Sequence, residues 1–182
     1  LLAKSNLRLV VSIAKKYGAE APFLRPKEMS GDGSRIGETI SFLLQRLRKE
    51  EEYVPDIIAL LQTTSPLREL EDIEKCYEII SNSKVKSVCT ICEISPWFYH
   101  LSSSDRLVLV NKKDGKTTNT QEAQRGYVLN GCMVYMIKTD MFLKTKKFVD
   151  EETVGVVCPR WRSIDLDNPE DWVLAEYVYK NK

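Results

Sequence analysis

Two aspartates near the end of the chain are the residues best suited to do chemistry. Asp165 and Asp167 are separated by one residue in Ser163-Ile-Asp-Leu-Asp167. In an extended segment alternate side chains point to one face, which predicts that both carboxylates project together. Neighbouring carboxylates repel each other unless a cation or a proton shares the site, and their hard oxygens favour Mg²⁺ or Mn²⁺. The pair is therefore a candidate metal site; the alternative is two solvated acids before a helix.

A second polar group follows an unbroken apolar run from Ile57 to Leu61. Such a run is typical of a strand covered on both faces, and Gln62 to Ser65 place an amide and three hydroxyls where it ends. Ligands of open α/β sheets bind beyond the carboxyl ends of the strands. Gln62 is thus a candidate ligand-binding residue, while Ser, Thr and Pro are just as typical of a turn that binds nothing.

Both stretches resemble signatures of one enzyme family. Leu60-Leu-Gln-Thr-Thr-Ser-Pro-Leu-Arg68 resembles the LLQ-x-TSPLR motif of the acylneuraminate cytidylyltransferases, the CMP-sialic acid synthetase family. Ser163-Ile-Asp-Leu-Asp-Asn-Pro-Glu-Asp-Trp172 resembles the SIDID-x-PEDW motif of the same family. The two motifs stand in the family's order, and with the connecting segments the resemblance extends over nearly all of the chain.

The resemblance implies a nucleotidyl transfer whose small-molecule substrates are CTP and an acidic keto-sugar. The anomeric hydroxyl of a nine-carbon keto-sugar acid, N-acetylneuraminate or a relative such as legionaminate, would attack the α-phosphorus of CTP and give a CMP-sugar and pyrophosphate. Asp165 and Asp167 would hold the catalytic Mg²⁺, or Mn²⁺ in its place, and Gln62 would orient the nucleotide or the sugar acid. Two alternatives remain: a nucleotidyltransferase for a different sugar, or a non-catalytic homologue that binds a nucleotide or sugar.

The other site residues are implied by the resemblance alone. Arg25 matches the arginine of the family's F-x-RP motif and would bind the nucleotide. Gln121, Asn130 and Tyr135 would bind the substrate, from a segment that resembles a Q-[DE]-x-P…NG pattern. This segment departs from the pattern in two places: Asn119-Thr120 replaces arginines that relatives often carry, and the tyrosine lies one residue later than usual.

The start of the chain lies outside the resemblance. Relatives open with a strand and a Gly-rich basic loop resembling PARGGSKG, which receives the triphosphate, and no such stretch occurs in these 182 residues. The strand-like Leu7 to Ser12 also passes into a helix end, Ile13 to Gly18, without a turn. We expect that a longer enzyme has an N-terminal segment here and further residues between Ser12 and Ile13; the alternatives are a genuinely shortened homologue and a natural short loop at this junction.

Helices and buried strands alternate along the chain, which predicts an α/β fold. We expect a three-layer helix–sheet–helix sandwich with a mostly parallel, Rossmann-like nucleotidyltransferase sheet, in a single domain over residues 1–182. Two helices are expected to turn apolar faces to the sheet, at Ile36, Ile40, Leu43, Leu44 and Leu47 and at Ile73, Cys76, Tyr77 and Ile80.

The last helix has a clear start, with Asn168 as N-cap and Pro169 at its first position. Its expected inward face is Trp172, Ala175 and Tyr179.

Residues from about 95 to 127 are expected to stand apart from this core. Pro96 to His100 bring three aromatic residues together, and Lys112 to Gln124 are polar without a sustained period. An aromatic cluster can line a sugar site, but it more often packs a subunit interface or a core edge. The resemblance implies that this region is an arm that pairs with a second subunit, so we expect a homodimer, with the polar segment as a loop over the site or a surface segment.

Composition excludes several classes of partner. With 43% hydrophobic and 29% charged residues the chain is typical of a globular protein, and its net charge of +1 favours neither nucleic acid nor an anionic membrane as a partner. There is no apolar run of membrane-spanning length. Five scattered cysteines, including Cys89 and Cys92 within a predicted strand, are interpreted as buried thiols of a cytoplasmic protein.

Overall fold

The structure is a computed structural model that describes residues 15–20, 23, 26–29, 33, 35–110 and 125–181. The chain divides into two units, Leu1–Val54 and Pro55–Lys182. We describe each unit by itself, and the single domain over residues 1–182 stays a prediction. The Ser12–Ile13 junction, Arg25 and the whole polar segment from Lys112 to Gln124, which includes Gln121, lie outside the described residues.

The first unit contains the short 3-10 helix η1 (Lys27–Met29) and the helix α3 (Ile36–Glu50). The predicted helix is confirmed, and its apolar face is narrower than expected. Ile40 and Leu44 are buried, whereas Ile36 and Leu43 are exposed. That this face covers the sheet stays a prediction.

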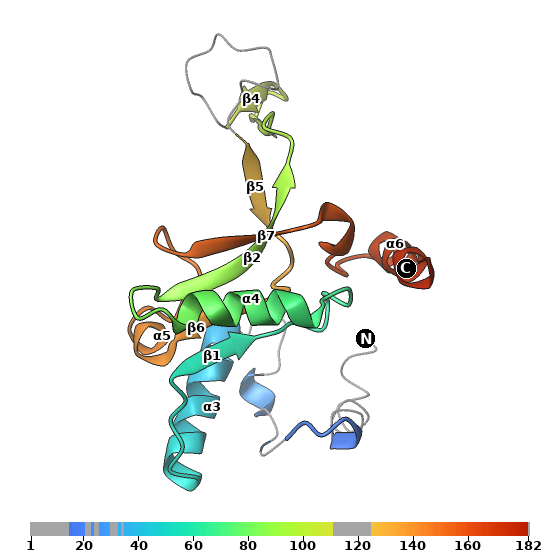
Figure 1. Cartoon of the computed structure of the whole chain (residues 1–182). Coiled ribbons are helices and arrows are strands. Elements are labelled where there is room, and N and C mark those ends of the chain that lie inside the picture. Colours follow the sequence, from blue (N-terminus) through green and yellow to red (C-terminus); the bar gives the residue numbers. More distant parts are fainter. Residues whose placement is uncertain are drawn as a thin grey trace. The chain divides into compact units, whose positions relative to one another are not determined.

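The second unit contains the sheet, the helices around it and a separate hairpin (Figure 1). Its elements in chain order are β1 (Ile57–Leu60), α4 (Leu70–Ser81), β2 (Ser87–Ile94), β3 (Tyr99–Leu101), β4 (Leu107–Leu109), β5 (Gly126–Leu129), β6 (Tyr135–Lys138), α5 (Thr139–Thr145), β7 (Val154–Cys158), η2 (Arg160–Arg162) and α6 (Pro169–Lys180). The described elements alternate between strand and helix from β1 to β2 and again from β6 to α6, which confirms the predicted α/β class.

The sheet is mixed rather than uniformly parallel. β2 pairs in parallel with β7 on one side, while β6 pairs antiparallel with both β1 and β2. As a result β1, β2 and β7 run in one direction, and β6 lies between two of them in the opposite direction. Three of the four pairings between described strands of this sheet are antiparallel, two through β6 and one between β2 and β5, so the sheet is less parallel than predicted.

A break between β5 and β6 is the most irregular feature of the sheet. In the register of β2, Ile91 faces Leu129 of β5 and Cys89 faces Tyr135 of β6. Residues 130–134 therefore all lie opposite Thr90 alone. Although the apolar residue types from Cys132 onward are typical of a strand, the chain leaves the ladder here and rejoins it at Tyr135.

Helix α4 covers one face of the sheet, in contact with β2, β6 and β7. Its Cys76 and Ile80 are fully buried in a core that also contains residues of these three strands, including Val88, Met136 and Cys158. The predicted inward Tyr77 is wrong, since its side chain is 59% exposed. It lies one position beyond the stripe that meets the sheet.

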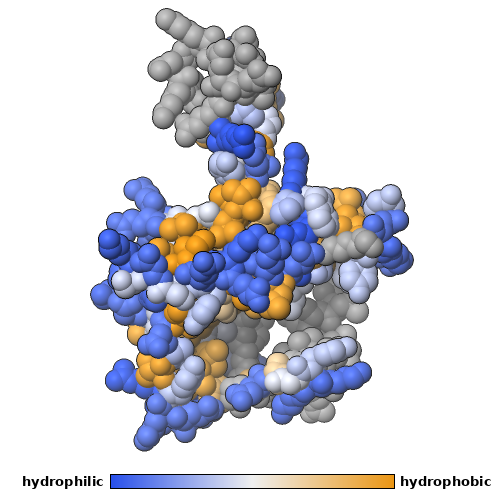
Figure 2. Space-filling model, viewed as in Figure 1, coloured by the Kyte–Doolittle hydropathy of each residue, from blue (hydrophilic) through white to orange (hydrophobic). Residues whose placement is uncertain are grey.

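Helix α6 begins as the sequence predicts. The Asn168 side chain accepts a hydrogen bond from the Asp171 main-chain nitrogen at 3.1 Å, and the Asn168 main-chain nitrogen donates to Asp171 Oδ2 at 3.0 Å. The predicted inward face is only partly right: Ala175 is buried with Leu67 and Ile164, while Trp172 and Tyr179 are 62% and 73% exposed. Figure 2 shows hydrophobic residues on the surface where α6 lies.

The predicted arm forms a two-stranded hairpin beyond the sheet. β2 and β5 continue as a ribbon past α4, and β3 pairs antiparallel with β4 at its end (Figure 1). Leu101 faces Leu107 across the hairpin, and both side chains are exposed. Among the described helices, none is long and apolar enough to cross a membrane.

Candidate active site

The turn after β1 is bound to the break between β5 and β6 through three successive carbonyl groups. Ser65 Oγ donates to the carbonyl of Gly131 at 2.8 Å, and the main-chain nitrogen of Gln62 donates to that of Cys132 at 3.3 Å. Arg68 Nε donates to the carbonyl of Met133. The turn therefore replaces the ladder partners that these carbonyls lose where the strand is interrupted.

Asp165 lies directly against Gly131. A Cβ atom on Gly131 would stand only 2.4 Å from Asp165 Cγ, and Gly131 has a left-handed φ of +71°. The next residue, Leu166, donates its main-chain nitrogen to the carbonyl of Thr64 at 2.9 Å. The predicted aspartate is thus brought to the turn that contains the predicted Gln62.

The carboxylate of Asp165 has one oxygen without a partner. Its Oδ1 is buried and receives no hydrogen bond in the part of the chain that the structure describes. A buried, unpaired carboxylate oxygen is costly, and a cation is one of the few partners that can offset that cost. The residue therefore fits a metal ligand.

Asp167 differs in its surroundings. Its main-chain nitrogen bonds to the carbonyl of Asp165 at 3.1 Å and to Asp171 Oδ2 at 3.0 Å, so the chain turns here, and its side chain is exposed. The alternation of an extended segment, on which the prediction of two parallel carboxylates rests, ends before this residue. Its role in metal binding stays a prediction.

Gln62 and Tyr135 lie at the edge of the same region. The Gln62 side chain is partly buried, and its Oε1 accepts a hydrogen bond from Thr64 Oγ1 at 3.3 Å. Tyr135 pairs with Cys89 in the sheet, and its ring centroid lies 6.4 Å from that of Phe148. Burial raises the pKa of the Tyr135 phenol, which keeps it a neutral hydrogen-bond donor.

Asn130 points into the protein. Its Oδ1 accepts from Thr90 Oγ1 at 2.8 Å, and its Nδ2 donates to Ser163 Oγ at 3.1 Å. Only 3% of the residue is exposed. Its contact with substrate stays a prediction, and these bonds give it a second role: they join the sheet, the break and the segment that leads to Asp165.

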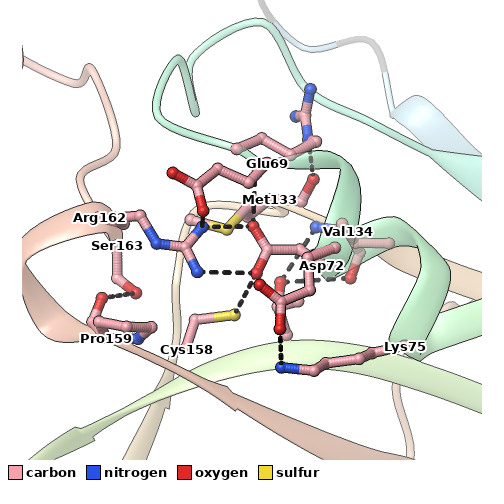
Figure 3. Close-up of polar contacts among 12 residues, drawn as sticks. Glu69, Asp72, Lys75, Met133, Val134, Cys158, Pro159, Arg162 and Ser163 are labelled. Carbon is pink, nitrogen blue, oxygen red and sulfur yellow. Dashed lines mark hydrogen bonds and ion pairs between the residues drawn. The ribbon is translucent and has the colours of Figure 1, made fainter. Parts of the chain in front are cut away.

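A buried ion pair between Arg162 and Asp72 fixes the start of the segment that leads to Asp165 (Figure 3). Arg162 Nη1 and Nη2 donate to the two carboxylate oxygens of Asp72 at 2.6 and 3.0 Å, and Cys158 Sγ lies 3.5 Å from Asp72 Oδ1. Burial by itself would raise the pKa of Asp72. Hydrogen bonds from Arg162 and from the Glu69 main chain outweigh burial and hold that pKa below its ordinary value.

Three curated relatives align with most of the chain. The CMP-N,N'-diacetyllegionaminic acid synthase of Legionella pneumophila is 28% identical over 97% of this chain and 76% of its own length. A pseudaminic acid cytidylyltransferase of Campylobacter jejuni is 26% identical over 94% of this chain and 74% of its own length. An N-acylneuraminate cytidylyltransferase of Streptococcus agalactiae is 24% identical over 82% of this chain and 35% of its own length. Over most of its length the chain is therefore similar to these cytidylyltransferases and synthases. No family model matches the chain.

Solved nucleotidyltransferase structures share the fold of this chain. The 4-diphosphocytidyl-2C-methyl-D-erythritol synthase of Anaerococcus prevotii superposes with a TM-score of 0.62 at 13% identity, over 98% of this chain and 78% of its own. A CMP:2-keto-3-deoxy-manno-octonic acid synthetase in complex with CTP superposes with a TM-score of 0.55 at 14% identity, over 94% of this chain and 78% of its own. These likenesses confirm the predicted α/β nucleotidyltransferase fold.

Sequence reasoning missed three residues that build this site. The main-chain nitrogen of the fully buried Thr90 donates to the carbonyl of Val134, and its hydroxyl accepts from the main-chain nitrogen of Val134, where the strand resumes. The other two are Arg68, which is bound to main-chain carbonyls, and Arg162, which is bound to Asp72. The Asn130-Gly131 pair, a turn signal, could have indicated the break.

The cysteines around this site are buried thiols, as predicted. All five are buried, and burial raises the pKa of Cys76, Cys132 and Cys158 to about 12. The described residues contain no group of three or more His, Cys, Asp or Glu side chains arranged to hold a metal. Besides the predicted Asp167, a metal at Asp165 would therefore take its other ligands from substrate phosphates, from water or from main-chain oxygens.

Replacing Arg162 by Met should destabilise the protein by about 3 kcal/mol at pH 7, because the buried Asp72 carboxylate loses its charge partner. Since the folded pKa of Asp72 is lowered, the stabilisation is complete above the ordinary pKa of an aspartate, about 4, and is lost as the pH falls through the folded value. The difference from wild type in urea unfolding should shrink below about pH 4.

Arg160→Met is the matched control, since Arg160 is exposed in the same short helix. It should change the free energy of unfolding by no more than about 0.5 kcal/mol. An equal loss in both variants would show that the ion pair does not carry the stability.

Proposed function

We propose that this protein transfers CMP from CTP to the anomeric hydroxyl of a nine-carbon keto-sugar acid and releases pyrophosphate. The names of its relatives, which are cytidylyltransferases or synthases for legionaminic, pseudaminic and acylneuraminic acids, support this reaction. The observation that carries the proposal is Asp165 Oδ1, which is buried without a partner among the described residues and lies beside the turn that contains Gln62. A carboxylate in this state suits a reaction in which a metal and a triphosphate meet.

Asp165 would hold a divalent cation, Mg²⁺ or Mn²⁺, with Asp167 as a second ligand. Such a cation, when bound, offsets the charge that develops on the phosphoryl oxygens and on pyrophosphate. The chain's other residues bind and orient: the Gln62 amide would hold the nucleotide or the sugar acid, and the neutral Tyr135 phenol would donate a hydrogen bond. Arg25 and Gln121 complete the proposed nucleotide and sugar contacts.

The identity of the sugar is left to experiment, because relatives with different sugars match at similar identity, from 24% to 28%. N-acetylneuraminate, N,N'-diacetyllegionaminate and pseudaminate are the three acids to compare. We place the reaction in the cytoplasm, a compartment in which five buried free thiols persist.

The first test is pyrophosphate release from the full-length protein with CTP, Mg²⁺ and each of the three acids. Release should require both Mg²⁺ and one of the sugars. Asp165→Asn should lower its rate at least about 100-fold, because a neutral amide cannot balance the charge of the cation. Asp167→Asn should also lower it.

Asp56→Asn is the matched control, an exposed aspartate just before β1, and it should retain the wild-type rate. Release that survives Asp165→Asn would contradict the metal assignment. A folded wild-type protein that releases no pyrophosphate with any of the three acids would favour a nucleotidyltransferase for another sugar or a non-catalytic binding protein.

A second test uses Gly131. Ala at this position should displace Asp165, since its Cβ atom would stand 2.4 Å from Asp165 Cγ, and a misplacement of about 1 Å can cost about 100-fold in rate. Pyrophosphate release should therefore fall by about that factor. Gly18→Ala controls for backbone strain, because Gly18 also has a left-handed φ, +82°, but has open space around it. Equal rates in the two variants would contradict the proposed contact.

We also propose that the protein forms a homodimer through the hairpin of β3 and β4. Its exposed side chains include Phe98, Tyr99, Leu101, Leu107 and Val110, which is an unusual amount of apolar surface for two three-residue strands. A second copy of the same chain would cover this surface by pairing hairpin against hairpin.

Light scattering at micromolar concentration should give twice the mass of one chain for the wild type. A double change of Leu101 and Leu107 to Glu should give the mass of a monomer, because two charges would enter the contact. Tyr77→Glu, on the exposed side of α4, should leave the dimer intact. A wild-type protein that is monomeric would contradict the proposal.

A further inference from the structure

Arg68 connects two segments that meet at the proposed metal ligand. Its Nη2 donates to the carbonyl of Gln62 at 2.6 Å, within its own turn, and its Nε donates to the carbonyl of Met133, across the site. Both acceptors are main-chain oxygens, so the guanidinium fixes backbone rather than side chains. Arg68 is partly buried, and no ion pair of Arg68 with an acid occurs among the described residues.

The segment that Arg68 holds is the one that contacts Asp165. Met133 is two residues after Gly131, and Gly131 lies against the Asp165 side chain. Ser65, from the same turn as Arg68, holds the carbonyl of Gly131 itself at 2.8 Å. A shift of residues 131–133 away from the turn would therefore open space beside the carboxylate and let it rotate.

The turn also holds Asp165 from its other side. Leu166 donates to the Thr64 carbonyl at 2.9 Å, so the residue after Asp165 is tied to the turn as well. The closing bond from Arg68 to Gln62 fixes the turn that makes this contact. Both the contact of Asp165 with Gly131 and the hydrogen bond of Leu166 to Thr64 thus depend on the shape of the turn from Gln62 to Arg68.

We propose that Arg68 is a positioning residue: by bonding to the carbonyls of Gln62 and Met133 it holds Gly131 against Asp165 and thereby sets the carboxylate for a divalent cation. This inference rests on the proposed function only in taking Asp165 as a metal ligand. A planar guanidinium reaches two acceptors in fixed directions, which the single ammonium of lysine does not reproduce. Arg68→Lys therefore keeps the positive charge but cannot form both hydrogen bonds in the same directions.

The test measures binding of Mn²⁺ to the full-length protein without substrates, by the loss of the free-ion electron paramagnetic resonance signal. Arg68→Lys and Arg68→Met should both weaken Mn²⁺ binding about 10- to 100-fold, the usual effect of removing a group that orients a metal ligand. Arg48→Lys and Arg48→Met, at an exposed arginine in α3, should bind as the wild type does. Circular dichroism confirms that each variant is folded.

Ser65→Ala is a second, smaller change that keeps the proposal testable if the Arg68 variants do not fold. It removes only the bond to the Gly131 carbonyl and should also weaken Mn²⁺ binding. In turnover, the Mg²⁺ concentration for half-maximal rate should rise in Arg68→Lys, while the KM for CTP at saturating Mg²⁺ stays as in the wild type.

The outcomes separate the two proposals. If the wild type binds Mn²⁺ through Asp165, as shown by loss of binding in Asp165→Asn, but the folded Arg68 and Ser65 variants bind equally well, the positioning role is wrong and the metal site stands. A raised KM for CTP with unchanged Mn²⁺ binding would make Arg68 a direct phosphate ligand and overturn its positioning role. A wild type that binds no Mn²⁺ overturns the metal site and this inference together.

Discussion

The site depends on how the protein satisfies main-chain carbonyls where its sheet is interrupted. Between Leu129 and Tyr135 the chain leaves the ladder, and residues 130–134 lie opposite Thr90 alone. Buried carbonyls left without donors would each cost about 1 to 3 kcal/mol. The turn from Gln62 to Arg68 supplies a main-chain nitrogen, a hydroxyl and a guanidinium to three of them in succession. Gln62, Ser65 and Arg68, whose residue types suggest ligand binding in the sequence, thus have a structural role in binding these carbonyls.

The second support comes from the helix that covers the sheet. Asp72 accepts a hydrogen bond from the Glu69 nitrogen at the start of α4 and also pairs with Arg162. Because α4 packs on β2, β6 and β7, this pair fixes η2 to the core. Asn130 then bonds to Ser163, one residue further along the chain. The segment that leads to Asp165 is consequently fixed to α4 through Arg162 and, through Ser163, to Asn130 at the break in the sheet.

The elements could be predicted from the sequence because they follow local rules. The apolar run of β1, the stripe of α4 and the Asn168 cap of α6 each depend on residues within a few positions of one another. The break before β6 could not be predicted from local pattern, because Cys132, Met133 and Val134 are as apolar as the strand they precede. The exposed Trp172 and Tyr179 were misplaced because periodicity defines an apolar face but not what covers it.

Within the site, the sequence indicated Asp165 and Gln62 but could not relate them. Arg68 bonds to an acceptor 65 residues away and Arg162 to one 90 residues away. The acceptor of Arg68 is a main-chain carbonyl, which every residue has, so no pattern of side chains in the sequence could predict this hydrogen bond. The Gly131 contact is equally hidden, because only the folded chain brings its Cα against Asp165.

These contacts also explain why a costly arrangement persists. Asp165 Oδ1 is buried without a partner among the described residues, which lowers the stability of the protein in the absence of a ligand. Cys132, with a φ of +57°, adds strain next to Gly131, whose left-handed φ suits glycine. The hydrogen bonds from Gln62, Ser65 and Arg68 to the carbonyls of residues 131–133 offset part of that cost. The fold therefore holds an acidic group in a position that a cation would improve, which is what a preorganised metal ligand requires.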